Sequence, residues 1–276
     1  MNVEIIAATR PEIRTRTKDT YGLCTMRVHV PLFIWTEILT HRRFARNASS
    51  ARAMSTERYT SMGYYKPTTW YKQQSGMQAG AAIDDDHVME DARTIYNTAF
   101  QKAVEYAQEL ESKGIAKEQR NRLIPPIKYV TGIITGTESA WRAFLALRNN
   151  TSADTAMQDI AEKIAHALAN VSWNYGIAHL PYVQETDSTA VDDKLRAIAH
   201  IARVSYNRDS GLDDLSLARR LLRDGHLSPF EHIAYWTRGP HLNCYVCKDD
   251  DVIGKYPSCY GWQSWRADME TGLYTG

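Results

Sequence analysis

Residues 37–52 read EILTHRRFARNASSAR, and the interpretation of the whole chain starts from this basic stretch. Positions 41–52 hold one His, four Arg, one Asn and two Ser among small residues. Guanidinium groups and hydroxyls bind phosphates and planar anions, and small side chains let a ligand approach the backbone. Because the chain has neither a P-loop nor a G-x-G-x-x-G motif, the stretch predicts a nucleotide-binding loop of another type. An exposed basic helix end is the alternative.

Charge is balanced over the whole chain but not around this stretch. The 276 residues include 33 Lys and Arg and 32 Asp and Glu, which gives a net charge of +1. Between positions 10 and 60 the acidic residues are Glu12, Asp19, Glu37 and Glu57. The basic residues of the same segment are Arg10, Arg14, Arg16, Lys18, Arg27, Arg42, Arg43, Arg46, Arg52 and Arg58. This local excess suits a small anionic ligand, and we expect no nucleic-acid partner.

The composition indicates a globular protein rather than a membrane or secreted one. Hydrophobic residues make up 43% of the chain, and the mean hydropathy is −0.46. No apolar run approaches the roughly 18 residues that cross a bilayer, and residues 1–10 lack the pattern of a secretory signal. The four Cys do not make a disulfide scaffold. We therefore expect a cytoplasmic protein with no membrane partner.

Hydrophobic periodicity predicts more helices than strands. Strands are expected at residues 3–8 and 26–30, a helix at 32–39 and a loop at 63–80. Further helices are expected at residues 117–123, 139–148, 153–171, 192–206 and 213–223. The pattern predicts an α+β fold in which helices dominate.

A long helix is expected after the acidic triplet at residues 84–86. The triplet complements the positive end of the helix dipole, which favours a structural role over a metal site. Gly114 is the expected stop of the helix. Its apolar stripe consists of Val88, Ala92, Ile95, Ala99, Ala103, Tyr106 and Leu110.

Five sequence elements together resemble the flavin-dependent thymidylate synthases. His41-Arg42, followed after seven residues by Ser50, is similar to the family signature R-H-R-x7-S, and the form THRRFARNASSAR resembles the bacteriophage branch. The other elements resemble the family's G-H-x-S-P-F-E-H, A-R-x-S-Y, R-x-x-x-P and N-F-x-x-L-R motifs. They are GHLSPFEH at 225–232, ARVSY at 202–206, NRLIPP at 121–126 and FLALR at 144–148.

The order of these elements is unusual. In common family members the A-R-x-S-Y and S-P-F-E-H elements precede the signature, whereas here they follow it. The resemblance implies one helix-rich domain over residues 1–276 with a small antiparallel sheet. Residues 1–183 would form the core that carries the T-H-R motif, and 191–276 the transposed segment. The sequence QETDSTA at 184–190 is itself the best candidate for a linker. Chain termini often lie close together, so such a permutation is physically tolerable.

The resemblance implies an enzyme that reductively methylates dUMP to dTMP. FAD would carry the hydride, NADPH would reduce the flavin, and methylenetetrahydrofolate would supply the carbon. The expected partners are a small nucleotide and further copies of the chain, in a homotetramer with active sites between subunits.

The resemblance also implies roles for individual residues. The cofactor would be bound by Thr40, His41, Arg42, Asn47 and His232. The nucleotide would be bound by Glu37, Ser50, Arg52, Arg122 and Arg148, with Arg122 coming from a neighbouring subunit. Arg148 and Ser50 would be the catalytic residues. Arg148 would stabilise the charge that develops on the base, and Ser50 would be a ligand to the phosphate rather than a nucleophile.

The chain departs from the common family pattern at five positions. Thr40 replaces the usual Arg, Ala48 the usual Glu and Ala53 the usual Tyr. Glu37 replaces the usual Gln, and Ala143 the usual Asn. A carboxylate accepts a hydrogen bond from an exocyclic amine, whereas Gln either donates or accepts. Glu37 therefore raises two alternatives, dCMP as the substrate or a hydroxymethyl nucleotide as the product. Ala48 and Ala143 raise a third, a non-catalytic nucleotide-binding protein.

A separate candidate metal site consists of His241, Cys244, Cys247 and Cys259. C-x-x-C is a zinc-ligand spacing, but the chain has no second pair of this kind. Reduced thiols without a metal are the favoured interpretation. His166 and His179 are expected to be ordinary hydrogen-bonded histidines of a helix and a loop.

Overall fold

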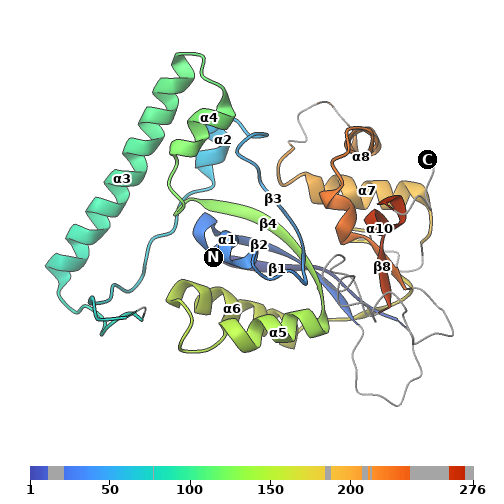
Figure 1. Cartoon of the computed structure of the whole chain (residues 1–276), viewed down its shortest axis with the longest axis horizontal. Coiled ribbons are helices and arrows are strands. Elements are labelled where there is room, and N and C mark those ends of the chain that lie inside the picture. The colour runs from blue at the N-terminus through green and yellow to red at the C-terminus, as the bar shows by residue number, and fades with distance from the viewer. Residues whose placement is uncertain are drawn as a thin grey trace.

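Helices surround a five-stranded sheet and a smaller three-stranded sheet (Figure 1). The computed structural model describes residues 1–11, 22–76, 78–183, 188–206, 211, 213–236 and 261–270. It confirms the helix-rich α+β fold with small, mainly antiparallel sheets. Within the described ranges, no helix combines the length and apolar character that a membrane crossing demands.

The larger sheet has the strand order β3-β4-β2-β1-β5. Its pairings are antiparallel, except that β5 runs parallel to β1 over a short contact. The strands are β1 (Asn2–Arg10), β2 (Leu23–Pro31), β3 (Ala45–Ala48), β4 (Tyr129–Thr137) and β5 (Asn174–Tyr175). The strands expected at 3–8 and 26–30 are confirmed, whereas the periodicity of the sequence does not indicate β4.

One face of this sheet packs on three helices. These are α1 (Leu32–Ile38), α5 (Glu138–Arg148) and α6 (Thr155–Ala169), and α5 and α6 lie beneath the sheet in Figure 1. Every second residue of β2 points to them and is completely buried, namely Cys24, Met26, Val28 and Val30. Because α1 and α5 share this core, Glu37 and Arg148 come close together at its edge.

Two glycines of β4 let aromatic rings lie directly on the sheet. A Cβ at Gly132 would stand 2.3 Å from the ring of Trp35, and one at Gly136 would stand 2.5 Å from the ring of Phe44. Both contacts are too short for any side chain at these positions. The glycines therefore fix the places of α1 and of the turn that follows it.

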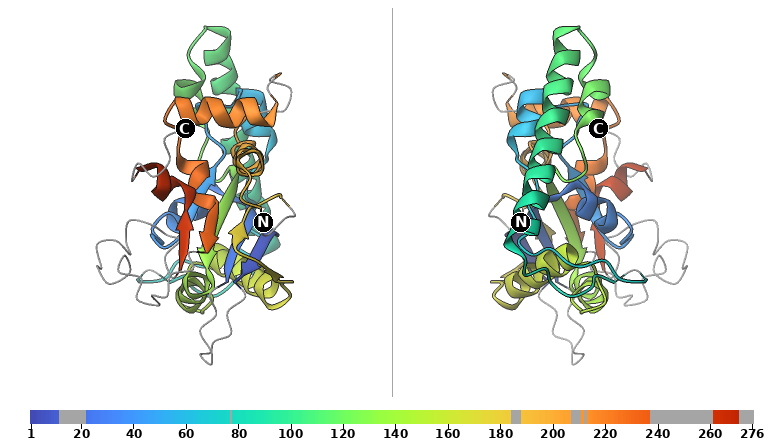
Figure 2. Two further views of the ribbon diagram at one scale, coloured as in Figure 1. Left: turned by 90° about the vertical axis from the view of Figure 1, so that its right-hand side faces the viewer. Right: turned by 90° about the vertical axis from the view of Figure 1, so that its left-hand side faces the viewer.

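The opposite face of the sheet is covered by the C-terminal segment (Figure 2). A second sheet of order β6-β7-β8 belongs to this layer. Its elements are β6 (Ala178–His179), α7 (Val191–Ala202), α8 (Asp214–Arg223), the 3-10 helix η3 (Ser228–His232), β7 (Ala234–Trp236), β8 (Trp262–Ser264) and α10 (Trp265–Glu270). The helix expected at 192–206 ends at Ala202, and residues 203–206 form a turn.

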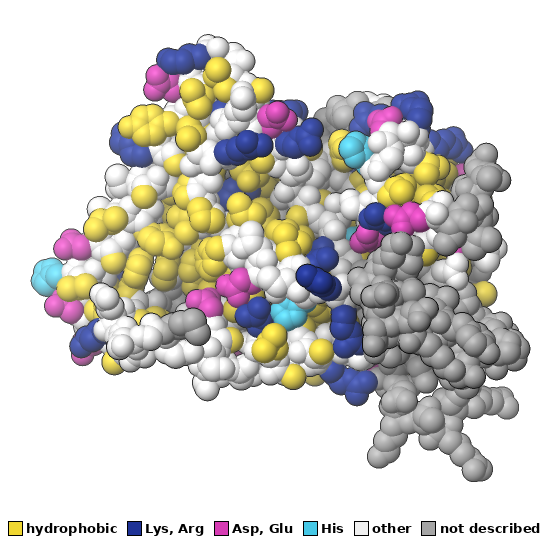
Figure 3. Space-filling model, in the orientation of Figure 1, with side chains coloured by type: hydrophobic (Ala, Val, Ile, Leu, Met, Phe, Trp, Pro, Cys, Tyr) yellow, Lys and Arg dark blue, Asp and Glu magenta, His cyan; other side chains and the backbone are white. Residues whose placement is uncertain are grey.

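The long helix α3 (Asp86–Ser112) stands at the far edge of the molecule (Figure 1). Phe100 and Ala107 bury one side of it against α2 (Thr56–Ser61) and the segment formed by α4 (Lys117–Arg120) and η1 (Asn121–Leu123). The expected apolar stripe is a different face and is largely exposed, with Val88 at 47%, Ile95 at 69% and Tyr106 at 57%. Hydrophobic side chains gather along α3 and between it and the central sheet (Figure 3).

Candidate active site

The turn after α1 carries the first residues of the basic stretch. The N–H group of His41 donates to the carbonyl oxygen of Ile38 at 3.0 Å, so the chain reverses directly after the helix. Phe44 anchors the turn because its buried ring packs on Trp141, with ring centroids 4.4 Å apart. The apolar anchor leaves the polar residues of the turn at the edge of the core.

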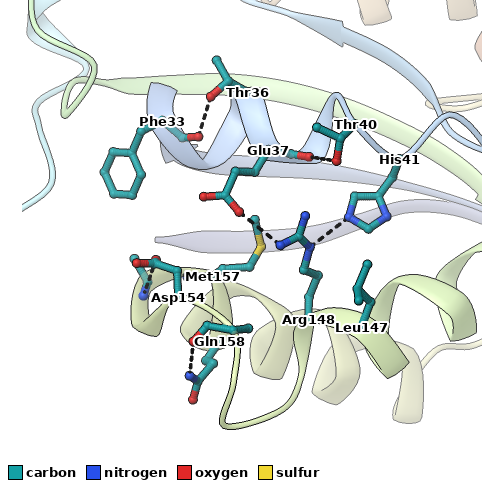
Figure 4. Close-up of polar contacts among 12 residues, drawn as sticks. Phe33, Thr36, Glu37, Thr40, His41, Leu147, Arg148, Asp154, Met157 and Gln158 are labelled. Atoms are coloured by element: carbon teal, nitrogen blue, oxygen red, sulfur yellow. Dashed lines mark hydrogen bonds and ion pairs between the residues drawn. The ribbon is translucent and has the colours of Figure 1, made fainter. Parts of the chain in front are cut away.

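Glu37, His41 and Arg148 meet where α1, the turn and α5 come together (Figure 4). Arg148 Nη1 lies 3.3 Å from Glu37 Oε2, and Arg148 Nε donates to His41 Nε2 at 3.1 Å. The side chains of Arg148 and Glu37 are 21% and 37% exposed, so a ligand can reach them. The structure thus brings together three predicted site residues from separate elements.

His41 is the neutral member of this cluster. Burial lowers its pKa, and the nearby Arg148 and Arg46 guanidinium groups lower it further. Because Nε2 accepts from Arg148, the proton of the neutral ring is assigned to Nδ1. The positive charge of the cluster therefore stays on arginine side chains, which suit an anionic or planar ligand.

Thr40 and Arg42 are exposed residues of the same turn. Thr40 Oγ1 donates to the carbonyl oxygen of Glu37 at 2.7 Å and so closes the end of α1. This hydroxyl would have to leave the carbonyl oxygen to donate to a ligand, but it can accept from a ligand where it stands. The cofactor contacts expected of Thr40 and Arg42 stay predictions.

Arg46 connects the turn to the S-P-F-E-H element. Its Nη1 donates to the carbonyl oxygens of Leu39 and, at 3.3 Å, of His41. Glu231 of η3 interacts electrostatically with Arg46 and forms an ion pair with Arg266. Burial raises the pKa of Glu231, and the two guanidinium groups oppose this rise. The C-terminal element therefore lies against the basic stretch.

Ser205 connects the A-R-x-S-Y element to the loop after β3. Its Oγ accepts from the N–H group of Ser50 at 3.0 Å and donates to the carbonyl oxygen of Ala48 at 3.1 Å. Asn47 Nδ2 donates to the carbonyl oxygen of Ile201 at 3.1 Å. Asn47, which is predicted to bind the cofactor, thus uses an amide N–H to hold the loop against α7.

A cavity of about 530 Å³ opens beside this loop. The side chain of Arg52 is 79% exposed and lies 3.3 Å from Glu118. An exposed ion pair of this kind contributes roughly 0–1 kcal/mol, so Arg52 can exchange Glu118 for a phosphate at little cost. The polar residues that line the cavity include Asn47, Ser50, Arg52, Ser205, His226 and Ser228.

A second cavity of about 630 Å³ shares Tyr206 with the first. Three arginines line it, namely Arg27, Arg58 and Arg203. Two of them have carboxylate partners, because Arg27 pairs with Glu4 and Arg203 with Asp214. Arg203 and Tyr206 belong to the A-R-x-S-Y element, whereas no sequence motif indicates Arg27, which belongs to a strand, or Arg58, which belongs to a short helix.

His232 is completely buried at the end of η3. Its Nδ1 lies 2.8 Å from Thr135 Oγ1, whereas Nε2 has no hydrogen-bond partner in the described part of the chain. Burial lowers the pKa of His232 to about 3, so the ring is neutral. A contact with a cofactor stays a prediction for this residue.

Arg122 is exposed on η1 and lines neither cavity described above. Its neighbour Asn121 is buried and donates to the carbonyl oxygens of Ala51 and Met54 at 3.0 and 3.3 Å. The element therefore supports the end of the basic stretch, while the guanidinium group of Arg122 is open to other molecules.

The acidic triplet has the expected structural role. Asp85 accepts hydrogen bonds from the N–H groups of His87 and Val88 and so caps α3. His179 is hydrogen-bonded, as expected, but lies in β6 rather than in a loop. The candidate zinc ligands at residues 241–259 lie outside the described residues, among which no cluster of His, Cys, Asp and Glu could hold a metal.

Comparison with known proteins decides the family. The family model described as thymidylate synthase complementing protein matches residues 22–172. This chain belongs to that family. As a member of the thymidylate synthase family, it is an enzyme that methylates a pyrimidine nucleotide. The match includes Glu37, residues 41–52, Arg122 and Arg148, whereas Ser205 and His232 lie beyond it.

Solved structures resemble this family member over part of its length. One is a UMP/dUMP methylase, PolB from Streptomyces cacaoi, bound with 5-Br dUMP; it is 23% identical, with a TM-score of 0.46, over 54% of this chain and 67% of that chain. The same protein bound with 5-Br UMP is 21% identical, with a TM-score of 0.49, over 61% and 88%. No curated protein sequence matches.

Proposed function

We propose that this thymidylate synthase family member converts dUMP to dTMP with FAD, methylenetetrahydrofolate as the carbon donor and NADPH as the reductant. One observation supports the proposal most strongly. Arg148 is held between Glu37 and His41, and the neighbouring loop at 47–52 is closed into a cavity by the segment that carries Ser205. Elements that are scattered in the sequence thereby form two polar clusters at the basic stretch, one around Arg148 and one around Ser50.

The loop end of the site suits the phosphate of the nucleotide. Ser50 and Arg52 line the cavity with a hydroxyl and a guanidinium group, and His226 and Ser228 add further polar groups. A phosphate would replace the weak Arg52–Glu118 pair with a charge-assisted hydrogen bond. In this arrangement Ser50 binds the substrate and is not an attacking group.

The Arg148 end of the site suits the pyrimidine base. Attack of C5 on the one-carbon unit places negative charge on the base, and a guanidinium group stabilises that charge where it develops. Glu37 and neutral His41 orient Arg148 by binding two different nitrogens of its guanidinium group, Nη1 and Nε. Because these contacts are partly exposed, Arg148 can exchange one of them for the base.

The residues also fit a flavin. A buried nitrogen without a partner, Nε2 of His232, calls for a hydrogen-bonding ligand atom. His41 and Arg42 would bind the same cofactor from the turn, and the bound flavin would supply hydride chemistry. Among the residues assigned to the cofactor, Asn47 lines the cavity of about 530 Å³, which shares Tyr206 with the cavity of about 630 Å³.

A homotetramer with shared sites follows from the same proposal. Arg122 lines neither cavity of its own chain, and the apolar stripe of α3 is exposed. Docking of a second copy on α3 would cover this stripe and could bring the partner's η1 to the site. Arg122 would then bind the nucleotide of a neighbouring subunit.

The proposal is tested with the purified protein and isotopically labelled methylenetetrahydrofolate. We expect a yellow protein that forms dTMP from dUMP when NADPH is added, detected by mass spectrometry of the product. Colourless protein that does not bind added FAD would contradict the cofactor assignment. Labelled product that carries a hydroxymethyl group would instead support the alternative of a hydroxymethyl nucleotide as the product.

Glu37 favours one second candidate, methylation of dCMP. Glu37 contacts Arg148 through Oε2. In the described part of the chain its other oxygen, Oε1, is not used in this contact and is available to accept from the exocyclic amine of cytosine. Turnover of dUMP and dCMP should be compared in the wild type and in Glu37→Gln. Turnover of dUMP alone by the wild type would remove the dCMP alternative.

A further inference from the structure

A row of buried polar side chains connects β1 to His232 across the interior. His179 Nδ1 lies 2.9 Å from Thr9 Oγ1, and His179 Nε2 lies 2.7 Å from Thr25 Oγ1. Thr25 Oγ1 lies 2.5 Å from Thr135 Oγ1, which in turn lies 2.8 Å from His232 Nδ1. All five residues are at most 2% exposed. We name this row, Thr9–His179–Thr25–Thr135–His232, the His–Thr row.

The sheet register explains the row. Thr25 of β2 pairs directly with Thr135 of β4, so both hydroxyls point to the face that the C-terminal segment covers. β6 brings His179 to one side of this pair, and η3 brings His232 to the other. The row therefore lies between the two layers of the molecule, where water is excluded.

Two arrangements of protons satisfy every contact when Thr25 and Thr135 both donate within the row. Burial lowers the pKa of both histidines to about 3, so each ring carries one proton. In the first arrangement His179 Nε2 donates to Thr25, Thr25 to Thr135, and Thr135 to His232 Nδ1, which leaves the proton of His232 on Nε2. In the second every donor is reversed, and His232 Nε2 is a bare acceptor. Both hold the same number of protons.

We propose that His179, Thr25 and Thr135 are positioning residues that decide whether Nε2 of His232 donates or accepts a hydrogen bond toward a bound ligand. The motivation is that Nε2 is the one end of the row without a partner in the described structure. A buried polar atom left without a partner is unfavourable, so a ligand that supplies the partner gains affinity.

A planar heterocycle with neighbouring N–H and C=O groups is the chemical class that fits. Such an edge offers both a donor and an acceptor, and the His–Thr row would select between them. For this protein the flavin ring has that chemistry, and this step rests on the proposed function. The hydrogen-bond relay itself does not depend on the identity of the ligand.

Solid-state NMR of protein with ¹⁵N-labelled histidine tests the relay without any ligand. The nine histidines are assigned for this purpose by comparison with His232→Gln, which removes one set of signals. We expect one ring tautomer for His232 in the wild type. We expect Thr25→Val to produce a mixture or the opposite tautomer, although Thr25 does not touch His232.

Matched variants separate the relay from a general loss of packing. Thr25→Ser keeps the hydroxyl and should restore the wild-type tautomer. Thr131→Val changes another threonine of β4, the strand of Thr135; its hydroxyl lies 3.3 Å from His29 Nδ1 and outside the row, so the change should leave His232 unchanged. If Thr25→Val does not fold, Thr9→Val at the far end provides the same measurement.

An unchanged His232 tautomer in a folded Thr25→Val protein would overturn the proposal. The ligand step has its own measurement, equilibrium dialysis with FAD. Here we expect Thr25→Val to weaken binding by about three- to tenfold, the effect of one misdirected hydrogen bond, and Thr25→Ser to restore it. A wild type that binds no FAD would refute the proposed cofactor, whereas the NMR result would still decide the relay.

Discussion

Arg148 makes two polar contacts with one guanidinium group, and this arrangement predicts its role. We expect Arg148→Ala to lower kcat by about 10²–10³-fold, because one preorganised donor to the developing charge is lost. FAD binding should remain, since the partly exposed pair with Glu37 contributes little to stability. Steady-state kinetics and FAD titration measure the two effects separately.

Arg142 is the matched control for this prediction. It is an exposed arginine of the same helix, so Arg142→Ala should leave kcat within about twofold. Loss of both turnover and FAD binding in Arg148→Ala would show that Arg148 has a structural role instead.

Lys128 is a buried amine outside the proposed chemistry. Its Nζ lies 3.4 Å from the ring centre of Tyr59 and has no hydrogen-bond partner in the described structure. Burial lowers the pKa of Lys128 from 10.5 to about 7. Because the group loses hydration without gaining a hydrogen bond, we expect Lys128→Met to raise the free energy of unfolding by about 1–3 kcal/mol at pH 7.

The pH dependence of this effect has a defined sign. Between pH 7 and 10.5 the unfolded chain binds more protons at Lys128 than the folded chain does, so wild-type stability rises with pH across this window. The advantage of Lys128→Met should therefore shrink between pH 7 and 9.5 in urea unfolding. Lys66→Met is the control, since Lys66 is exposed and lies 5.0 Å from the ring centre of Tyr64. An advantage that stays constant with pH would contradict the prediction.

At the scale of elements, β4 positions the turn that carries His41. We expect Gly136→Ala to destabilise the protein by about 1–3 kcal/mol, because the new Cβ would overlap the ring of Phe44. The displaced ring should also weaken ligand binding at the turn. Thermal unfolding and nucleotide titration measure both effects.

A second substitution tests whether the contact with Phe44 is the cause. Phe44→Leu makes room, so the double variant should be more stable than the sum of the two single changes predicts. Simple additivity would show that Gly136 matters for another reason, such as backbone conformation.

Elements with clear periodicity could be predicted from the sequence, and those defined by partners could not. β1 follows from a short apolar run and β2 from alternation, and the ends of α3 follow from the acidic triplet at 84–86 and from Gly114. β4 is not indicated, because Gly132 and Gly136 interrupt its hydrophobic pattern. These glycines make room for aromatic rings of other elements, which the local sequence does not reveal. The apolar stripe of α3 is visible in the sequence. The local sequence does not indicate, however, that a different face of the helix is the one buried within the chain.

The candidate site shows the same division. The motifs point to Glu37, His41, Ser50 and Arg148, since polar residues in an unusual pattern are recognisable one by one. Ser205 lies within a recognised motif, but its support of the loop depends on a contact across 155 positions. The His–Thr row could not be anticipated, because single threonines in strands carry no signal of what lies opposite.

At the scale of the whole molecule, the exposed stripe of α3 predicts self-association. We expect Ile95→Glu to reduce the size of the assembly and to lower activity, because a charge would have to be buried in the contact. Gln101→Glu is the control on an exposed polar part of the same helix. Mass photometry or light scattering measures the size, and an unchanged assembly in Ile95→Glu would exclude α3 as the contact.

The support of the loop by Ser205 has a consequence for biosynthesis. The ribosome releases the basic stretch long before Ile201 and Ser205, which fasten residues 47–50. A nascent chain of which only the first half has emerged therefore contains the motif but lacks the residues that hold residues 47–50 in place. Nucleotide capture should begin only after the later segment has emerged and docked, so a stalled or truncated polypeptide would be inert despite carrying every residue of the signature.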